Sequence, residues 1–418
     1  MKLHSKLIPL GKRVLFIALL VVFGCQEPTE DDTTLPFQTF SNTYGTGTGL
    51  KIRDNTDGEF YSILSNLNAY DFDPNSQEPD VYDYAIVNTD YLGEEIDRIF
   101  LDLDSTFSPI GHNFTIDNGI VIIGYKDDDS YGKDIYIVKY SAAGIIDWTK
   151  RIGSDYESEY LPPDELWLSD SSCAAFFDQQ GSNTDYGHGI IQISDNGYII
   201  TGCFECRVYR SDLYVIKLDE NGNYEWIKCF PFIASGKGIL ETDEGYLVTG
   251  VIVDQEYISD YSDAFLLKIS KEGEQIWLKT FDFVQGNVGG GGALDWGHEI
   301  QESDDNYFLR GRGFVKTDLE GNEIWRMNEW VGKSFDIVND EDVVFTGSTS
   351  TGYVNSRNLF ISYYSSDGDS LWTENFGDSS EYSYGTSILS IDGGYIMSGQ
   401  KNEEIWLLKV DEDGNLEE

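Results

Sequence analysis

The sequence predicts an all-β fold built from repeated small sheets, and three observations lead to it. First, a strand–turn–strand motif, "VIKLDENGNYEW" at 215–226, recurs in seven copies with one register. Second, a hairpin signal precedes each copy. Third, the chain is 14% aromatic with 43 glycines, and no stretch keeps a helical periodicity. Four short antiparallel strands per repeat of about 50 residues describe the blade of a β-propeller. We therefore expect a seven-bladed β-propeller with four-stranded antiparallel blades.

The first 24 residues are expected to be a signal peptide that lies outside the fold. The apolar run at 14–23 is too short to span a bilayer. Four positive charges precede or open this run, at Lys2, Lys6, Lys12 and Arg13. A basic start followed by a short apolar core is typical of secretory signals.

The signal ends in "VVFGC", which resembles a bacterial lipobox. The resemblance implies cleavage after Gly24 and attachment of lipid, including palmitate, to Cys25. An ordinary signal with a free or buried cysteine is the alternative. Residues 25–34 are polar and acidic, as suits a flexible tether, and they resemble the surface-export signals of Bacteroidota lipoproteins. We expect a lipoprotein anchored in the outer membrane and exposed at the cell surface, with the periplasmic face as the alternative.

The charge of the chain excludes one class of partner. It has 74 acidic and 28 basic residues, a formal net charge of −46, which becomes −50 once the four charges of the signal are removed. Such a surface repels phosphate backbones, so we expect no nucleic-acid partner.

Each of the seven motif copies places the same residue types at the same spacing. The turn glycines are Gly93, Gly144, Gly222, Gly273, Gly321, Gly368 and Gly414. A tryptophan opens the next strand four residues later in five copies, at Trp148, Trp226, Trp277, Trp325 and Trp372. Glycine suits the tight turn, and the indole can wedge between blades, so we expect these tryptophans to dock one blade on the next.

The hairpin ahead of each copy completes the blade. Its tight Asp/Asn/Gly turn and short β-branched strand, as in "DNGYIITG", supply the first two of four strands. Within the propeller at 35–418, the predicted blades lie at about 46–105, 106–153, 185–232, 233–283, 295–331, 332–377 and 378–418, with an insertion at 154–184. The third strands are apolar on both faces because neighbouring blades cover them.

The ends of the chain predict how the ring closes. The last copy stops with Glu418 where a tryptophan is expected, so the last blade lacks its fourth strand. The segment "LPFQTFSNTYG" at 35–45 is similar to the fourth strands of other blades. We expect residues 35–40 to supply the missing strand and remove two exposed edges.

The turn-and-tryptophan pattern resembles the repeat of quinoprotein-like (PQQ-like) propellers over about residues 46–418. This family includes quinoprotein dehydrogenases and a lipid-anchored outer-membrane assembly factor, and its members commonly have eight blades. A WD40 assignment fits less well, because tryptophan here opens the fourth strand. The calcium ligands and adjacent-cysteine ring that serve the quinone in the family have no counterpart in this sequence, so the resemblance does not extend to dehydrogenase activity.

The connections predict which face of the disc binds. All turns between first and second, and between third and fourth, strands are short, and every long segment is one of the other connections. Long loops on a rigid scaffold commonly carry binding sites. The candidate ligand-binding residues on this face are Tyr160, Trp167 and Trp296, with a small local core in the insertion as the alternative role.

Four cysteines remain after the signal, at Cys173, Cys203, Cys206 and Cys229. A secreted setting favours disulfides, and four cysteines allow three connectivities. Cys203–Cys206 with Cys173–Cys229 is favoured here, and a zinc site is the alternative.

Three histidines suggest a possible metal site. His112, His188 and His298 each open a first strand, and they could converge at the mouth of the axial channel with Asp185 or Asp295 nearby. A divalent ion such as Ca or Zn is then the possible cofactor. Against this, the spacing to the following turn differs among the three, and a one-residue slip turns a strand side chain to the other face.

The sequence shows no nucleophile elbow, HExxH or P-loop. We therefore expect a non-catalytic binding or scaffolding module for a glycan or an envelope protein. The alternative is a carbohydrate-active lyase or hydrolase with a metal near the axial channel.

Overall fold

The structure is a computed structural model of the whole chain. It describes residues 37–55, 60–67, 84–128, 132–153, 166–167, 183–207, 210–253, 261–283, 293–295, 297–339, 341–350, 357–378 and 381–416. The chain divides into the units Met1–Phe37 and Gln38–Glu418. The predicted signal peptide and tether lie outside the described residues, and the fold below is that of the second unit.

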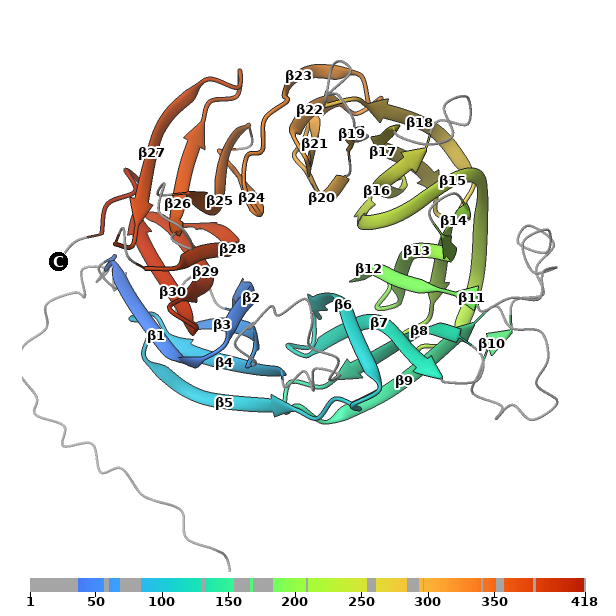
Figure 1. Cartoon of the computed structure of the whole chain (residues 1–418), viewed down its shortest axis with the longest axis horizontal. Helices are drawn as coiled ribbons and strands as arrows, with labels where there is room; N and C mark the ends of the chain where they lie inside the picture. Colours follow the sequence, from blue (N-terminus) through green and yellow to red (C-terminus); the bar gives the residue numbers. More distant parts are fainter. Residues whose placement is uncertain are drawn as a thin grey trace, which may run out of the picture. The chain divides into compact units, whose positions relative to one another are not determined.

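Gln38–Glu418 forms an all-β propeller with four-stranded antiparallel blades (Figure 1). Four sheets have four strands each. They are β2 (Thr48–Asp54), β3 (Phe60–Asn66), β4 (Tyr84–Asp90) and β5 (Glu95–Leu101); β20 (Gly297–Glu302), β21 (Asn306–Gly311), β22 (Phe314–Asp318) and β23 (Glu323–Met327); β24 (Ser334–Val338), β25 (Asp342–Ser350), β26 (Arg357–Tyr364) and β27 (Ser370–Phe376); and β28 (Ser383–Ile391), β29 (Gly394–Lys401), β30 (Glu404–Asp411) and β1 (Phe40–Thr46).

Two larger sheets complete the ring. One contains β6 (Phe107–Phe114), β7 (Ile120–Asp128), β8 (Gly132–Tyr140) and β9 (Ile146–Gly153), with short parallel additions from β10 (Leu166–Trp167) and β11 (Asn183–Thr184). The other contains β12 (Tyr186–Gln192), β13 (Tyr198–Arg207), β14 (Arg210–Leu218), β15 (Tyr224–Thr242), β16 (Gly245–Val253), β17 (Tyr261–Ser270), β18 (Gln275–Phe281) and β19 (Ala293–Leu294).

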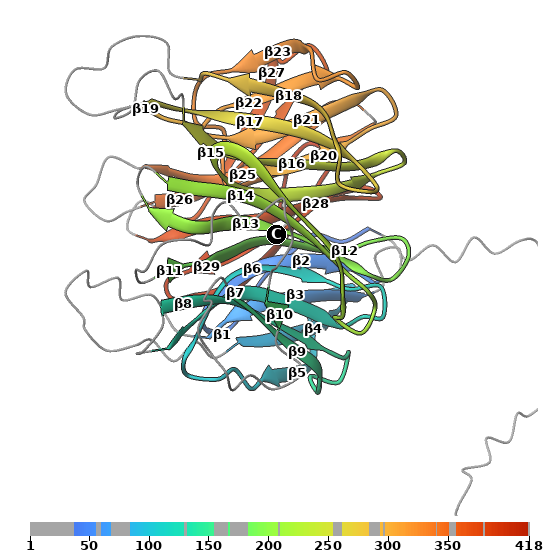
Figure 2. The same cartoon turned by 90° about the vertical axis from the view of Figure 1, so that its right-hand side faces the viewer.

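The described strands therefore form six hydrogen-bonded sheets, where the sequence predicted seven separate ones. The difference comes from β15, whose first half pairs with β14 and whose second half pairs with β16. Figure 2 shows this long strand passing from one set of strands to the next. The chain makes the passage without a loop because "WIKCFPFIASGKG" stays extended throughout.

The core lies between neighbouring four-stranded units. One apolar cluster joins Val121 and Ile137, from β7 and β8, to Ile200 and Tyr214, from β13 and β14. Other clusters repeat this arrangement between the units that follow around the ring. Both faces of each middle strand are covered, which explains why those strands are apolar on both sides.

The indole of one unit packs on the turn glycine of the next. A Cβ built on Gly222 would lie 2.8 Å from the Trp148 ring, and one built on Gly321 would lie 2.8 Å from the Trp277 ring. The same approach joins Gly273 to Trp226, Gly368 to Trp325 and Gly414 to Trp372. These turn glycines also have φ between +75° and +84°. Only glycine meets both requirements, the left-handed backbone and the absence of a side chain beneath the indole.

Strand β1 carries the residue that stands in for the missing tryptophan. It pairs antiparallel with β30, and Phe40 faces Lys409, as Trp226 faces Lys217 in another sheet. A Cβ on Gly93 would lie 2.4 Å from the Phe40 ring. The predicted segment, residues 35–40, was therefore placed too early, since the strand begins at Phe40. The register is set by Phe40, the aromatic residue opposite Lys409.

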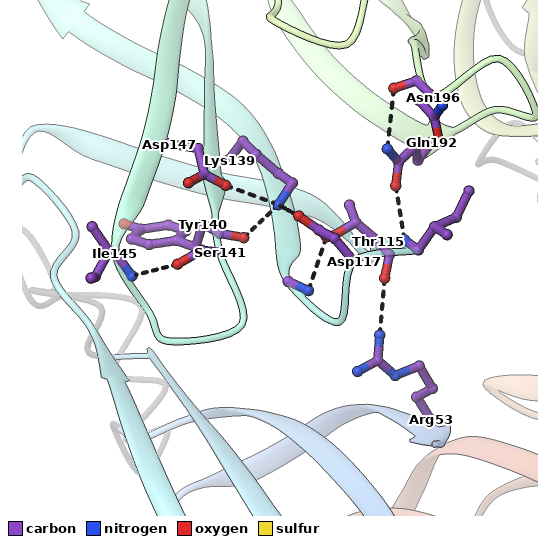
Figure 3. Close-up of polar contacts among 12 residues, drawn as sticks. Arg53, Thr115, Asp117, Lys139, Tyr140, Ser141, Ile145, Asp147, Gln192 and Asn196 are labelled. Atoms are coloured by element: carbon purple, nitrogen blue, oxygen red, sulfur yellow. Dashed lines mark hydrogen bonds and ion pairs between the residues drawn. The ribbon is translucent and has the colours of Figure 1, made fainter. Parts of the chain in front are cut away.

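Ion pairs reinforce the short-turn side of several units. Lys139 is buried on β8, and its Nζ lies 2.9 Å from Asp117 Oδ2 and 3.2 Å from Asp147 Oδ2 (Figure 3). Burial opposes the charge of Asp117, yet the hydrogen bond from Lys139 lowers the pKa of this carboxyl.

Hydrogen bonds also join this turn to both neighbours (Figure 3). Arg53 Nη1 donates to Thr115 O at 3.1 Å, and the backbone N–H of Ile116 donates to Gln192 Oε1 at 2.8 Å. Adjacent units are thus fixed at their inner strands as well as at their outer tryptophans.

Within the described residues, no helix is long and apolar enough to cross a membrane.

We predict that Phe40→Ala destabilises the protein, because it removes the ring that packs on Gly93. Phe40 is only half-buried, so the expected loss is about 2 kcal/mol, below the roughly 3–5 kcal/mol of a fully buried phenylalanine. Chemical denaturation measures the loss. Phe60→Ala, at a side chain that is 42% exposed, is the control and should cost under about 0.5 kcal/mol. Equal losses for the two variants would contradict the role given to Phe40.

Candidate functional site

A β-bulge recurs at the same place in the innermost strands. In β12, the pairing with β13 shifts between Gly187 and Gly189, so that His188 is the extra residue. Equivalent shifts single out Leu50, Ile110, Lys237, His298 and Thr386. Lys333 takes the matching place just before β24, between Gly332 and Ser334. We call these seven residues the axial ring, since their strands are innermost (Figure 1).

Close approach between inner strands holds the axial ring in place. A Cβ on Gly111 would lie 1.9 Å from the carbonyl oxygen of His188, and one on Gly238 would lie 2.5 Å from that of His298. The bulges at His188 and His298 therefore pack their backbones against a glycine of the preceding inner strand. None of the seven side chains is fully buried, whereas Gly187, Gly236 and Gly297 beside them are. The bulges thus present seven side chains at the inner edge of the ring.

The axial ring carries two lysines, Lys237 and Lys333, and two histidines. Lys237 Nζ lies 2.9 Å from His188 Nε2, and the Sγ of Cys203 lies 3.9 Å from the same nitrogen. Lys333 Nζ sits 4.1 Å above the ring of Tyr384. Leu50 and Ile110 are the apolar members.

Arg310, on β21, adds a guanidinium beside the axial ring. Its Nε donates to Glu299 Oε2 at 2.9 Å, and its Nη1 donates to the carbonyl oxygen of Gly332 at 3.3 Å. The group is therefore fixed between the bulge of β20 and that preceding β24.

The surrounding protein shifts the pKa values of these groups toward the neutral forms. Burial, with Lys237 and His298 nearby, holds the pKa of His188 well below its usual value. Burial, Arg310 and Lys237 lower the pKa of His298 to about 4, although its side chain is itself exposed. Burial lowers the pKa of Lys237 to about 8. At pH 7 the imidazoles are neutral and Lys237 is still largely protonated.

The structure separates His112 from the other two predicted metal ligands. His188 and His298 occupy equivalent bulges, whereas Ile110 takes that position in β6 and His112 lies two residues further, opposite Ile122. The unequal spacing to the following turn was the signal of this slip. Burial and the charge of Lys51 lower the pKa of His112 to about 3. Lys237, Lys333 and Thr386 each stand between a glycine and a glycine or serine, as His188 does, and this Gly-x-Gly or Gly-x-Ser pattern is the sequence signal for the equivalent positions.

Possible metal ligands gather elsewhere. Asp263, Asp282 and Asp295 place carboxylate oxygens within 4.8 Å of one another, and this is the one such group of three among the described residues. Asp295 is buried and accepts a hydrogen bond from the backbone N–H of Phe283 at 2.7 Å. Asp185 is also buried, and its backbone N–H donates to Lys133 O. The three histidines thus form no ligand group with one another or with these aspartates within that distance.

The predicted ligand-binding aromatics cannot be placed. Tyr160 and Trp296 lie outside the described residues, and for Trp167 only the backbone, in β10, is described. Their role remains a prediction.

The described cysteines restrict the disulfide pattern. Cys203 and Cys229 are each disulfide-bonded, while Cys173 and the side chain of Cys206 lie outside the described residues. Cys203 is on β13 and Cys229 on β15, on opposite sides of β14. Two strand spacings put their Cα atoms about 10 Å apart, beyond the roughly 7 Å that a disulfide spans. The two therefore do not pair with each other.

Of the comparisons with known proteins, only the one with solved structures finds matches. No family model matches the chain, and no curated protein matches it either. Among solved structures, the chain is similar to a Bacteroides caccae protein of unknown function, with 10% identity and a TM-score of 0.41 over 70% of this chain and 90% of that one. It is also similar to BamB from Moraxella catarrhalis, with 10% identity and a TM-score of 0.40 over 89% and 98% of the two chains. The propeller assignment rests on the strand pairing of this chain itself.

We predict that non-reducing peptide mapping finds two bridges and no Cys203–Cys229 peptide. The two allowed patterns are Cys203–Cys206 with Cys173–Cys229, which the sequence favoured, and Cys173–Cys203 with Cys206–Cys229. A directly linked Cys203–Cys229 peptide from folded protein would refute the strand order given for this sheet.

We also predict that stability falls as pH drops from about 6.5 toward 4. In the unfolded chain His112 and His298 take up protons near pH 6.5, whereas in the folded protein they do so only near pH 3 and 4. Because the unfolded state binds more protons in this window, acid favours unfolding. Imidazole chemical shifts measured by NMR give the two midpoints, and midpoints near 6.5 would contradict the prediction. His298→Asn should flatten the pH dependence of chemical denaturation.

Proposed function

We propose that the protein is a non-catalytic binding or scaffolding module of the cell envelope that contacts its partner through one face of the propeller. The observation that carries this is the unequal length of the connections on the two faces. In each antiparallel unit, the first-to-second and third-to-fourth connections lie on one face and the others on the opposite face.

The strand bounds show that the longest connections lie on one face, although that face also has short ones, such as Gly311 to Phe314 and Lys401 to Glu404. On one face, Gln192 is followed by Tyr198, and Ile391 by Gly394, across tight turns. On the other face, β3 ends at Asn66 and β4 begins at Tyr84, and β18 ends at Phe281 while β20 begins at Gly297. A rigid ring that concentrates its long segments on one side suits recognition there.

The proposal includes a ring of seven blades that the amino-terminal strand closes. It counts the eight-stranded sheet as two blades that share β15, and β1 with β28, β29 and β30 as the last blade. Support comes from the apolar cluster that joins Tyr44, Ile396 and Ile405 to Ile52 and Ile63 across the junction of the two ends.

The location and the partner class follow from the sequence. The lipobox-like "VVFGC" supports lipid attachment at Cys25 and an outer-membrane position, and the acidic tether supports the outer surface. A glycan or an envelope protein is the proposed partner.

The enzyme alternative has one observation in its favour, the equivalent positions of His188 and His298. Lys237 weakens it, because an ammonium 2.9 Å from His188 Nε2 stands where a divalent cation would have to bind. The binding module is therefore the better supported function.

The test compares the two faces of the mature protein on glycan arrays and by cross-linking to purified envelope proteins. Replacing 154–182 with a short Gly-Ser linker should weaken partner binding at least tenfold. Glu220→Lys, a charge reversal at an exposed tight turn on the other face, should leave binding unchanged. Loss of binding in Glu220→Lys alone would overturn the assignment of the face, and stoichiometric metal that disappears in His188→Ala/His298→Ala would favour the enzyme.

A further inference from the structure

We propose that the axial ring is a binding site for an oxyanion, the carboxylate, sulfate or phosphate group of a small ligand. The inference does not depend on the partner proposed for the long-connection face, because it rests on the inner strands alone.

The first argument is that the axial ring carries unpaired positive charges although the chain as a whole is strongly acidic. The chain has 74 acidic residues against 28 basic ones, and most lysines of the described strands pair with a carboxylate. Such pairs hold Lys126, Lys139, Lys217, Lys228, Lys268, Lys271, Lys316 and Lys401. Across the described part of the chain, Lys237 and Lys333 of the axial ring have no such pair, and neither do Lys133, Lys150 and Lys279, which lie on outer parts of the sheets.

Lys51 repeats this observation one residue beyond the ring. It follows Leu50 on β2, and it too lacks an ion pair among the described residues. Its charge interacts at longer range with Glu299, on β20. Lysines from β2, from β15 and from the residue before β24 thus surround the axis without carboxylate partners. A bound anion would provide the negative charge that these lysines lack.

The second argument is the supply of donors at one level. An oxyanion among the bulges would meet the ammonium groups of Lys237 and Lys333 and an imidazole N–H from His188 or His298. Neutral imidazoles donate one hydrogen bond without adding charge, while Arg310 contributes a guanidinium that Glu299 orients. Hydrogen bonds between charged donors and oxyanions are the strong ones.

The acidic groups that face this level do not cancel the cations. Glu299 is paired with Arg310, and Ser334 Oγ donates to its second oxygen at 3.3 Å. Asp336, two residues beyond Ser334, accepts the backbone N–H of Ser390 at 2.6 Å, and burial raises its pKa to about 6. The level of the axial ring therefore keeps a net positive charge.

The desolvated cations give the anion its affinity. Burial lowers the pKa of Lys51 and Lys237, which means that their charged forms are poorly solvated in the free protein, whereas the Lys333 side chain is exposed. An anion placed beside them replaces missing water and stabilises the protonated lysines. Leu50 and Ile110 border the opposite side of the ring, and Ile110 is 40% exposed. This side suits a carbon skeleton, so an organic oxyanion should bind more tightly than an inorganic one.

The experiment titrates the mature protein with inorganic phosphate, sulfate and glucuronate at pH 7 and low ionic strength, where screening is weak. Isothermal calorimetry gives affinities, and NMR follows the Cε1–H signals of His188 and His298. We expect saturable binding with shifts in both histidines, weakened at least tenfold in Lys237→Gln/Lys333→Gln. Glucuronate tighter than phosphate would identify an organic oxyanion, and the reverse order an inorganic one.

Controls separate binding from folding and from overall charge. Lys279→Gln, which removes an equal charge from the outer strand β18, should bind like the parent protein. Lys237→Arg/Lys333→Arg keeps the charge and should retain binding even if the glutamine variant is unstable. The proposal is overturned if the parent binds none of the three anions, or if the arginine and glutamine variants bind them equally.

Discussion

The contact on which the structure depends is an indole ring lying against a glycine turn of the neighbouring unit. It explains two sequence constraints together, since the turn needs a left-handed residue and the indole needs a surface without a side chain. An antiparallel unit of four strands cannot cover its own faces and must pack against neighbouring units. The contact between indole and glycine fixes how each unit packs on the next. Because each tryptophan points to the next unit along the chain, the stacking has one direction, and Phe40 continues it from β1 to Gly93.

Because the outer contacts hold the units together, the inner strands can carry bulges that expose side chains. Their bulges interrupt ladder pairing at one level and turn a side chain toward the inner edge. Glycines beside the bulges allow the neighbouring backbone to come close, so the positions of the exposed side chains are set by the backbone and not by their own packing. Scaffold and site are therefore encoded in different places, the first in the turn-to-tryptophan spacing and the second in the bulges of the inner strands, where four of the seven ring residues stand in Gly-x-Gly or Gly-x-Ser triplets.

The sequence predicted the scaffold better than the site. The repeats allowed the propeller, the turns and the third strands to be predicted, because a spacing shared by seven copies does not depend on the deviations of any single copy. The prediction failed where a position departs from the repeat. Strand β15 continues without a loop, and β1 begins at Phe40. His112 lies two residues beyond the position equivalent to His188. Each is a matter of register, which pairing decides and composition does not. Lys237 and Lys333 were hard to find because a lone lysine on a strand is ordinary until its partners are known.

The pairing of β1 with β30 has a mechanical consequence. The two ends of the chain meet there, and only hydrogen bonds and side-chain contacts join them, whereas β15 joins its two sets of strands covalently. Tension applied at the amino terminus would load β1 first and peel or shear it from β30, while the rest of the ring stays covalently continuous. A pull on the amino terminus would therefore act directly on the β1–β30 pairing, the one junction of the described ring that no covalent connection spans.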